Sequence, residues 1–427
     1  MIVRAERAML PTGVAPAEIH VEGDRIVSVR PPGTPSTPST RHPAPGVILF
    51  PGLIDPHVHV NEPGRTEWEG FVTASAAAAA GGITTIVDMP LNSVPATTTV
   101  RGLEMKREAA RASNVNVEFW GGVVPGNASE LDALVDGGVR GFKCFLSPSG
   151  VEEFEHVDEG DLRLALPTLA RRGLPLLVHA ELPAALRPVD PAADPQCYAT
   201  WLASRPPRAE AEAIAVLAAL CREFRAHIHI VHVASAEALA IVAAAKQEGL
   251  PLTAETCPHY LTFCAEEIPD RQTQFKCAPP IRERTHREAL WRALGDGVLD
   301  FIATDHSPCP PAMKGDGDFI AAWGGIASLE LSLAATWTEA AARGYPIERL
   351  AVWMSAAPAR LAGLSDRGAI APGMRADLVE WDPDASFAVD QRGLRQRHPR
   401  TPYHGRTLRG RVLRTYVGGR LVYGDAE

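Results

Sequence analysis

The stretch from about residue 46 to about residue 306 alternates between short apolar runs and segments of helical character. The apolar runs number eight and cover residues 47–59, 83–89, 115–124, 141–146, 174–179, 228–233, 252–257 and 301–306. Alanine-rich segments such as 73–80, 209–224 and 236–246 lie between them. Because short buried strands that alternate with helices form a parallel sheet, this α/β pattern predicts a (β/α)8 barrel of the TIM type. Its active site is expected at the C-terminal ends of the strands.

Both ends of the chain show a different pattern, in which apolar and polar residues alternate. Near the N-terminus this pattern covers residues 19–22 and 26–29, with a Gly-Asp turn between them. Short strands of the same kind return at residues 377–381 and 411–422. Such alternation indicates strands with one buried face. We therefore expect the two ends to pair into one small β-sandwich domain beside the barrel.

The domains follow from these patterns and from the segments between them. Residues 31–46 are rich in proline, serine and threonine, which predicts an irregular connection. A helical stretch is expected over about residues 329–360. The small β domain is predicted to comprise residues 1–48 and 368–427, and the barrel residues 49–367.

Composition narrows the class of function. The chain of 427 residues has 46% hydrophobic residues, 22% charged residues and a formal net charge of −9 without a basic run. This argues against binding to nucleic acid and to anionic membrane surfaces. Seven cysteines without a CxxC pair make a disulfide framework unlikely for the fold. The N-terminus lacks a long apolar segment, so we expect a soluble, cytoplasmic protein that acts on a small molecule.

Four histidines, a lysine and an aspartate lie at or near the ends of the predicted barrel strands. They are His57, His59, Lys143, His179, His232 and Asp305. Because His57 and His59 are separated by one residue, both imidazoles of an extended segment project to the same side and can hold one metal ion. The pair alone is equally compatible with two solvent-facing histidines. Together, the six residues at the catalytic end of a barrel favour a site for two metal ions.

One of the predicted strands contains three histidines, which alternation sorts onto two faces. His232 shares a face with Ile228 and Ile230, whereas His227 and His229 share the other. Only one face can point into the barrel. We expect His232, which ends the strand, to be the ligand. His227 and His229 are then expected under the helical layer, with their hydrogen bonds satisfied.

Lys143 and Asp305 each allow two interpretations. In the apolar run 141–146 a lysine either extends to solvent or is desolvated, and desolvation lowers the pKa and makes the amine nucleophilic. A neutral lysine can add carbon dioxide to form a carbamate, whose two oxygens can bridge two metal ions. Asp305 ends the eighth run, where a lone aspartate usually caps a helix.

The string PGLIDPHVH at residues 51–59 resembles the opening of the amidohydrolase superfamily, and within it the cyclic amidohydrolases: dihydroorotases, hydantoinases and allantoinases. Similar motifs follow at residues 141–143, 179–181, 231–233, 255–260, 277–282, 304–308 and 368–378. The resemblance implies that two divalent ions are bound by His57, His59, His179, His232 and Asp305, with carboxylated Lys143 as the bridging ligand. It also implies that a hydroxide shared by two metals attacks a cyclic amide, while Asp305 passes the proton to the departing ring nitrogen.

The residue after the H-x-H pair bears on the substrate. Dihydroorotases carry arginine at the position of Asn61, where a guanidinium can hold a substrate carboxylate. Asparagine cannot offer that charge, so a neutral ureide fits better. The loops at residues 61–70, 89–95, 307–314 and 322–326 resemble those of the allantoinases, although their prolines and glycines could also serve only as turns.

The loop resemblance implies hydrolysis of allantoin to allantoate in purine and ureide breakdown. On the same ground Asn61, Asn92, Cys277 and Ala278 are expected to bind the substrate. A hydantoinase or dihydropyrimidinase is the nearest alternative, followed by a dihydroorotase. A catalytically silent scaffold related to these enzymes is a remote third.

The resemblance also sets expectations for cofactors and assembly. A site of histidines, carboxylate and carbamate suits two zinc ions per subunit, with cobalt, iron or manganese as alternatives. Carbon dioxide would be consumed in the carboxylation of Lys143. The spacing of the cysteines, including Cys144, Cys257, Cys277 and Cys309, fits no thiolate zinc site. A homo-oligomer is expected, namely a tetramer.

Overall fold

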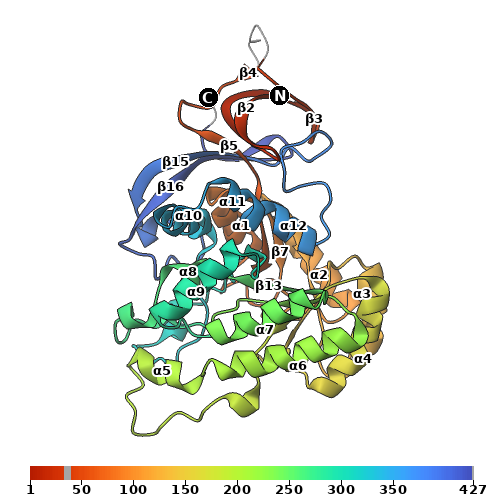
Figure 1. Ribbon diagram of the computed structural model, residues 1–427, viewed down its shortest axis with the longest axis vertical. Helices are drawn as coiled ribbons and strands as arrows, with labels where there is room; N and C mark the ends of the chain where they lie inside the picture. The colour runs from red at the N-terminus through yellow and green to blue at the C-terminus, as the bar shows by residue number, and fades with distance from the viewer. Residues whose placement is uncertain (33–39, 426–427) are drawn as a thin grey trace.

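A barrel of parallel strands forms the lower part of the computed structural model, which describes residues 1–32 and 40–425 (Figure 1). Its strands are β6 (Leu53–Val58), β7 (Ile83–Asp88), β8 (Asn116–Phe119), β9 (Gly121–Gly122), β10 (Phe142–Phe145), β11 (Leu176–His179), β12 (Ile228–Ile230), β13 (Leu252–Thr256) and β14 (Phe301–Ile302). β8 and β9 share one position in the barrel, interrupted at Trp120. Val58 pairs with His306 and closes the ring. The predicted (β/α)8 barrel is confirmed, because each predicted apolar run supplies one strand position.

Helices connect the barrel strands and cover their outer side (Figure 1). The longer helices are α1 (Phe71–Ala80), α2 (Val100–Ala110), α4 (Glu159–Arg172), α6 (Arg208–Phe224), α7 (Ala236–Gln247), α9 (Arg284–Gly295) and α10 (Ser332–Ala342). The shorter ones are α3 (Leu131–Asp136), α5 (Tyr198–Ser204), α8 (Pro258–Thr262), α11 (Glu348–Ala351) and α12 (Ala357–Leu361). Within residues 1–32 and 40–425, no helix has the length and apolar character needed to cross a membrane.

Local sequence explains where these helices begin and end, as α4 illustrates. The side chain of Asp158 accepts a hydrogen bond from the backbone N–H of Asp161, and the side chain of Asp161 accepts one from the backbone N–H of Asp158. The helix ends at Gly173, whose φ of 66° suits a residue without a Cβ atom.

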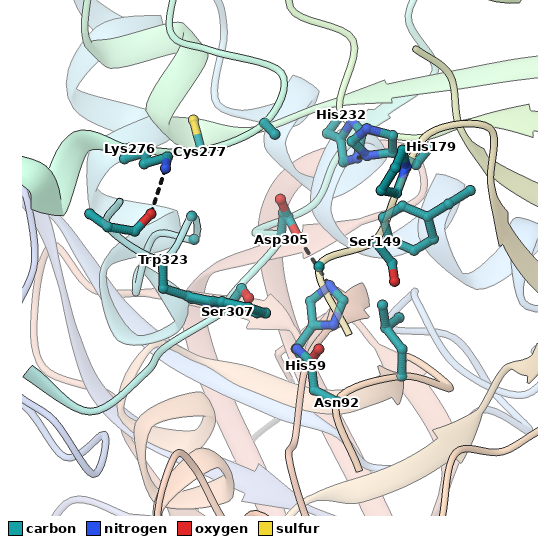
Figure 2. Close-up of a pocket in the computed structure, with 18 of the residues that line it drawn as sticks. His59, Asn92, Ser149, His179, His232, Lys276, Cys277, Asp305, Ser307 and Trp323 are labelled. Atoms are coloured by element: carbon teal, nitrogen blue, oxygen red, sulfur yellow. Dashed lines mark hydrogen bonds and ion pairs between the residues drawn. The ribbon is translucent and has the colours of Figure 1, made fainter. Parts of the chain in front are cut away.

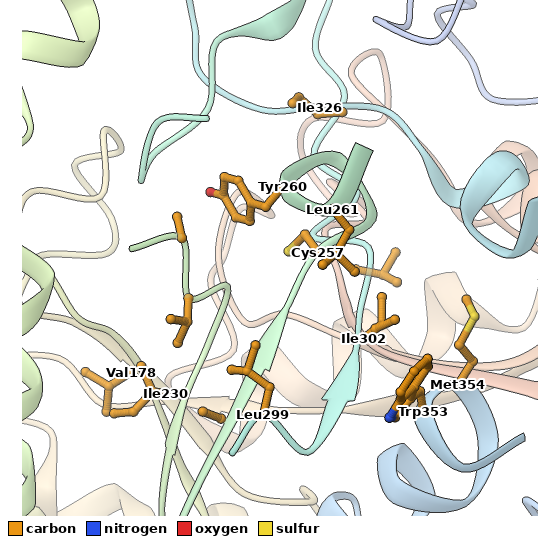
Figure 3. Close-up of a cluster of buried hydrophobic side chains, with 14 of the residues drawn as sticks. Val178, Ile230, Cys257, Tyr260, Leu261, Leu299, Ile302, Ile326, Trp353 and Met354 are labelled. Carbon is orange, nitrogen blue, oxygen red and sulfur yellow. The ribbon is translucent and has the colours of Figure 1, made fainter. Parts of the chain in front are cut away.

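The barrel strands direct alternate side chains toward the helices and toward the barrel axis. Val178 and Ile230 belong to the outer core, which Figure 3 shows together with Ile302. Leu177 and Phe301 belong to a second cluster with Trp120, on the inner side of the strands. Because the period of a strand is two residues, one strand serves both layers.

Strands from both ends of the chain form one eight-stranded sheet above the barrel (Figure 1). They are β1 (Ile2–Leu10), β2 (Gly13–Glu22), β3 (Arg25–Arg30), β4 (Thr40–Arg41), β5 (Ile48–Pro51), β15 (Leu378–Ala388), β16 (Thr407–Val417) and β17 (Arg420–Tyr423). Their order is β17-β16-β15-β5-β1-β2-β3, with β4 beside β1. The expected β domain built from both chain ends is therefore present.

The passage from this sheet into the barrel occurs at Gly52. β5 pairs with β15 and β1, whereas β6 pairs with β7. A Cβ atom at Gly52 would collide with the side chain of Thr84, so only glycine fits there. The domain limits at residues 48/49 and 367/368 stay predictions. Of the predicted connection 31–46, residues 33–39 lie outside the described part of the chain, as do residues 426–427 of the C-terminal segment.

Candidate metal centre and reaction cavity

The six residues predicted as a metal site line one cavity of about 280 Å³ (Figure 2). These residues are His57, His59, Lys143, His179, His232 and Asp305. His57, Lys143 and His179 lie on β6, β10 and β11, and the other three follow barrel strands within three residues. Parallel strands of a barrel end at one rim, so residues that are distant in the chain meet there.

Asp305 lies beside both histidines of the H-x-H pair. Its Oδ1 is 3.1 Å from Nε2 of His57 and 3.3 Å from Nε2 of His59. Burial by itself would raise the pKa of Asp305, but the charge of His57 and hydrogen bonds to both imidazoles hold that pKa well below its ordinary value. Asp305 is therefore an anion that faces two ring nitrogens, which is the arrangement of a ligand and not of a helix cap.

The two histidines of this pair differ in protonation. Burial lowers the pKa of His57, but the charges of Asp305 and Glu255 on either side of its ring outweigh burial and raise that pKa to about 9. For His59, burial prevails and lowers the pKa to about 4. In the metal-free site His57 thus carries a proton between two carboxylates, and His59 is neutral.

His179 and His232 form the second half of the site. Nδ1 of His179 lies 3.0 Å from Nε2 of His232, and the two rings stand edge to face with centroids 4.7 Å apart. Burial lowers the pKa of both imidazoles, which keeps both neutral with lone pairs available. The ring of His57 lies 5.5 Å from the ring of His232, so the two halves adjoin.

Lys143 is buried within the same cavity. Its side chain is 1% exposed, and Nζ lies 4.3 Å from the centroid of the Phe145 ring. The interpretation that this lysine extends to solvent is therefore wrong. Burial lowers the pKa of Lys143 to about 8, against the opposing charge of Asp305. A useful fraction of the amine is then neutral near physiological pH, and the neutral form is the one that adds carbon dioxide.

The donor atoms in the cavity fit divalent metal ions. Imidazole nitrogens and a carboxylate oxygen are donors that zinc, cobalt, iron and manganese accept. The ligand atoms of His57, His59 and Asp305 lie within 4.8 Å of one another. Two neutral nitrogens that face each other, as in His179 and His232, need a proton or a cation between them. Among the described residues, the group formed by His57, His59 and Asp305 contains no cysteine.

The sequence interpretation missed Glu255, a fully buried carboxylate on β13. Its Oε1 lies 2.5 Å from Nδ1 of His57, and its Oε2 lies 3.1 Å from Nε2 of His229. These contacts orient His57 so that Nε2 faces the cavity. The signal in the sequence was the alternation of Thr253 and Glu255, which are two polar residues on one face of the strand.

The predicted place of His229 was wrong. This residue lies inside the barrel with its ring stacked on Phe301 at 5.1 Å, and Ile230 faces the helices instead. Alternation does not extend to His232, because β12 ends at Ile230 and His232 has a left-handed φ of 43°. His232 and Ile230 were expected on the same face of the strand. In the structure His232 enters the cavity, whereas Ile230 points away from the barrel axis.

A second carboxylate supports His179. Oε2 of Glu181 lies 2.8 Å from Nε2 of His179, which leaves Nδ1 to face His232. Arg205 contacts both oxygens of Glu181, with Nη2 2.6 Å from Oε2. Arg205 also lines the cavity, but this two-point ion pair engages its guanidinium.

Three of the four residues expected to bind substrate line the cavity, namely Asn92, Cys277 and Ala278. Asn61 is fully buried and does not belong to the lining. Its amide nitrogen lies 3.5 Å from the carbonyl oxygen of Pro308. The contact of Asn61 with substrate stays a prediction.

The protonation of His57 leads to a prediction about metal uptake. Below pH 9 the metal-free protein holds a proton on His57, and a histidine must lose that proton to become a ligand. We expect metal binding at pH 7 to release this proton, and the apparent Kd to fall about tenfold per pH unit until about pH 9. Calorimetry in buffers of different ionisation enthalpy measures the number of protons released.

Glu255→Gln is the matched variant for this experiment. It keeps the shape of the side chain but removes one of the two charges that raise the pKa of His57. Fewer protons should be released, and metal affinity should fall about 10- to 100-fold. Equal proton release and equal affinity in the two proteins would contradict the role given to Glu255.

Comparison with known proteins gives a consistent picture. Residues 48–422 match the family described as the Amidohydrolase family. The sequence is 48% identical to the allantoinase of Streptomyces avermitilis, over 100% of this chain and 96% of that protein. It is 43% identical to the allantoinase of Arabidopsis thaliana, over 100% of this chain and 88% of that protein. The structure resembles the L-hydantoinase (dihydropyrimidinase) of Arthrobacter aurescens, with a TM-score of 0.93, 30% identity and coverage of 100% and 96%.

Proposed function

The chain belongs to the amidohydrolase family, and from this membership we propose that it hydrolyses the cyclic amide bond of allantoin to give allantoate. The observation that carries the proposal is the convergence of two histidine pairs, Asp305 and a desolvated lysine in one cavity. The same convergence speaks against a silent scaffold, because nothing in a scaffold requires so many buried metal-type donors to meet in one cavity. The protein is an enzyme that acts on a cyclic amide.

We further propose two divalent metal ions, zinc first among the candidates. His57, His59, His179, His232 and Asp305 would hold them, and Lys143 would bridge them after its amine is carboxylated by carbon dioxide. When bound, the ions supply an activated water and a Lewis acid for the substrate carbonyl. The lowered pKa of Lys143 supports the carboxylation, since the reaction needs a neutral amine.

Asp305 is the residue that moves the proton. Its low pKa keeps it ionised at neutral pH, and a carboxylate at this position can accept the proton of the attacking water. Water adds to the carbonyl carbon, the carbon–nitrogen bond of the ring breaks, and Asp305 delivers the proton to the departing nitrogen. The products are a carboxylate and a free ureido nitrogen on one open chain, so no covalent intermediate with the protein is required.

The lining of the cavity favours a neutral substrate. Besides Lys143, the lysine and arginine side chains that line it are Arg205 and Lys276. Both already form polar contacts with other residues of the protein. Arg205 is paired with Glu181, and Lys276 donates hydrogen bonds to backbone carbonyls. Neither is free to hold the carboxylate of dihydroorotate in a two-point contact. The relatives with 43–48% identity are allantoinases, whereas the hydantoinase neighbour is 30% identical.

Initial rates on allantoin, dihydroorotate, hydantoin and dihydrouracil, measured side by side on one preparation with determined metal content, test this proposal. We expect allantoin to exceed the other three in kcat/KM by at least about a hundredfold. A preference for hydantoin or dihydrouracil would leave the metal site intact and overturn the substrate. Inertness toward all four substrates at full metal content would contradict the proposal that this protein hydrolyses a cyclic amide.

We also propose a homotetramer, on the resemblance to the cyclic amidohydrolases alone. Sedimentation velocity at micromolar concentration measures the assembly directly. A single species of the monomer mass would contradict this proposal without affecting the site, because all six site residues come from one chain.

A further inference from the structure

Lysine is rare in this chain, and most of its lysines are buried. Only five of the 42 lysine and arginine residues are lysines, and four of these five are buried. Lys143 belongs to the metal site, and Lys106 forms an ion pair with Asp88. Lys276 and Lys314 have no part in the mechanism described above, although they are 5% and 6% exposed.

These two ammonium groups bind the backbone of one loop. Nζ of Lys276 donates to the carbonyl oxygens of Ile320 at 2.9 Å and Ala322 at 2.5 Å. Nζ of Lys314 donates to the carbonyl oxygens of Trp323 at 2.9 Å and Gly325 at 2.6 Å. Segment 315–325 contains no helix or strand, so these charge-assisted hydrogen bonds are a main restraint on its path.

Neither ammonium has a carboxylate partner within ion-pair distance among residues 1–32 and 40–425. Burial lowers the pKa of both lysines to about 8, which reflects the cost of removing each charge from water. An apolar residue of similar length would fill the same space without this cost. What such a residue could not do is hold two carbonyl groups at one point, because it has no N–H donors.

The loop that they hold forms one wall of the reaction cavity. Residues 321–325 all line the cavity, and Figure 2 shows Trp323 on the side opposite His179 and His232. The indole of Trp323 packs edge to face on Trp68, with ring centroids 5.0 Å apart. Its Nε1 is buried and has no hydrogen-bond partner among the described residues. The indole lines the cavity, so a turn of this side chain would bring its N–H to a carbonyl oxygen of a ligand there.

We propose that Lys276 and Lys314 are positioning residues that hold loop 320–325 against the cavity, and that Trp323 on this loop binds a carbonyl of the ureide substrate through its indole N–H. The proposal rests on the proposed function for the identity of the substrate. The lysines act through the loop, whereas Trp323 touches the substrate and contributes to the preference for a ureide over a plain hydantoin ring.

The test combines three substitutions with kinetics and hydrogen exchange. Lys276→Met and Lys314→Met keep the length of the side chain and remove the donors. Both should raise KM for allantoin about tenfold or more, change kcat less than about threefold, and speed amide exchange in segment 320–325 at least about tenfold. Trp323→Phe should raise KM for allantoin to a similar extent with exchange unchanged, and should raise KM for hydantoin less.

Two further variants guard against a mere loss of folding. Lys314→Gln keeps amide donors and should recover part of both losses seen in Lys314→Met. Lys246→Met, on α7, removes a lysine that contacts Asp300 away from the cavity, and should match the wild type throughout. Metal content should be equal in all proteins.

Other outcomes distinguish a failure of the inference about the loop from a failure of the proposed substrate. Unchanged KM in both methionine variants, or faster exchange of the loop without any rise in KM, would overturn the inference. Full metal content with turnover of hydantoin but not of allantoin by the wild type would overturn the proposed substrate instead, and the exchange rates would still show whether the lysines position the loop.

Discussion

Replacing Lys143 with alanine is expected to abolish the paired metal site and to lower kcat by at least about a thousandfold. The amine is buried between the two histidine pairs, and no other carboxylate-like group among the described residues lining the cavity can bridge them except Asp305. Metal analysis should show less than two ions per subunit. Activity should return in part when acetate or propionate is added, because a small carboxylate can occupy the space of the lost carbamate.

The control for this experiment is Lys246→Ala, in which a partly exposed lysine is removed and both metal content and activity should persist. Unchanged metal content in Lys143→Ala would contradict the bridging role. Loss of metal without any rescue by carboxylates would show that the variant has lost the shape of the cavity, and a Lys143→Met variant that fills this space would then decide between the two explanations.

Replacing Asp305 with asparagine is expected to remove turnover while substrate binding largely remains. Asparagine keeps an oxygen at the position of Oδ1, which faces His57 and His59, but it cannot accept and release a proton. We expect kcat to fall about a thousandfold or more, in line with the loss of a general base, and the Kd for allantoin to rise less than about tenfold.

Rapid-reaction kinetics and calorimetry with allantoin measure the two quantities separately. Asp305→Asn with near-normal kcat would rule out the proton-transfer role. A large rise in Kd with little further loss of kcat would assign Asp305 to ground-state binding. Metal content must be determined in the same samples, because Asp305 is also a proposed ligand.

The alternation of apolar runs and helices was sufficient to predict the barrel, because the hydrophobic period of each segment is a local property of the sequence. The six site residues could be predicted for a related reason. They stand at the ends of those runs, and a barrel brings the C-terminal ends of all its strands to one rim. The β domain built from both chain ends could be predicted as well, because apolar and polar residues alternate near both termini.

The direction of a side chain could not be predicted where the backbone leaves regular secondary structure. His232 and Asp305 have φ values of 43° and 46°, a left-handed conformation that side-chain alternation does not describe. This is why His229 was assigned to the wrong side of the strand. Asn61 was expected to bind substrate from the loop resemblance; it is fully buried and is not among the residues that line the cavity.

The sequence by itself thus determined the fold and the positions of the metal-type donors, because these depend on periodicity and residue type. The chemical class of the reaction followed from the resemblance of its motifs to those of the cyclic amidohydrolases. Only the tertiary structure decided which buried groups support them. Glu255 reaches His57 across the barrel, and Lys276 and Lys314 converge on loop 320–325 from separate segments. Such contacts join residues that share no local pattern, and they exist only because the closed barrel brings its loops together at one rim.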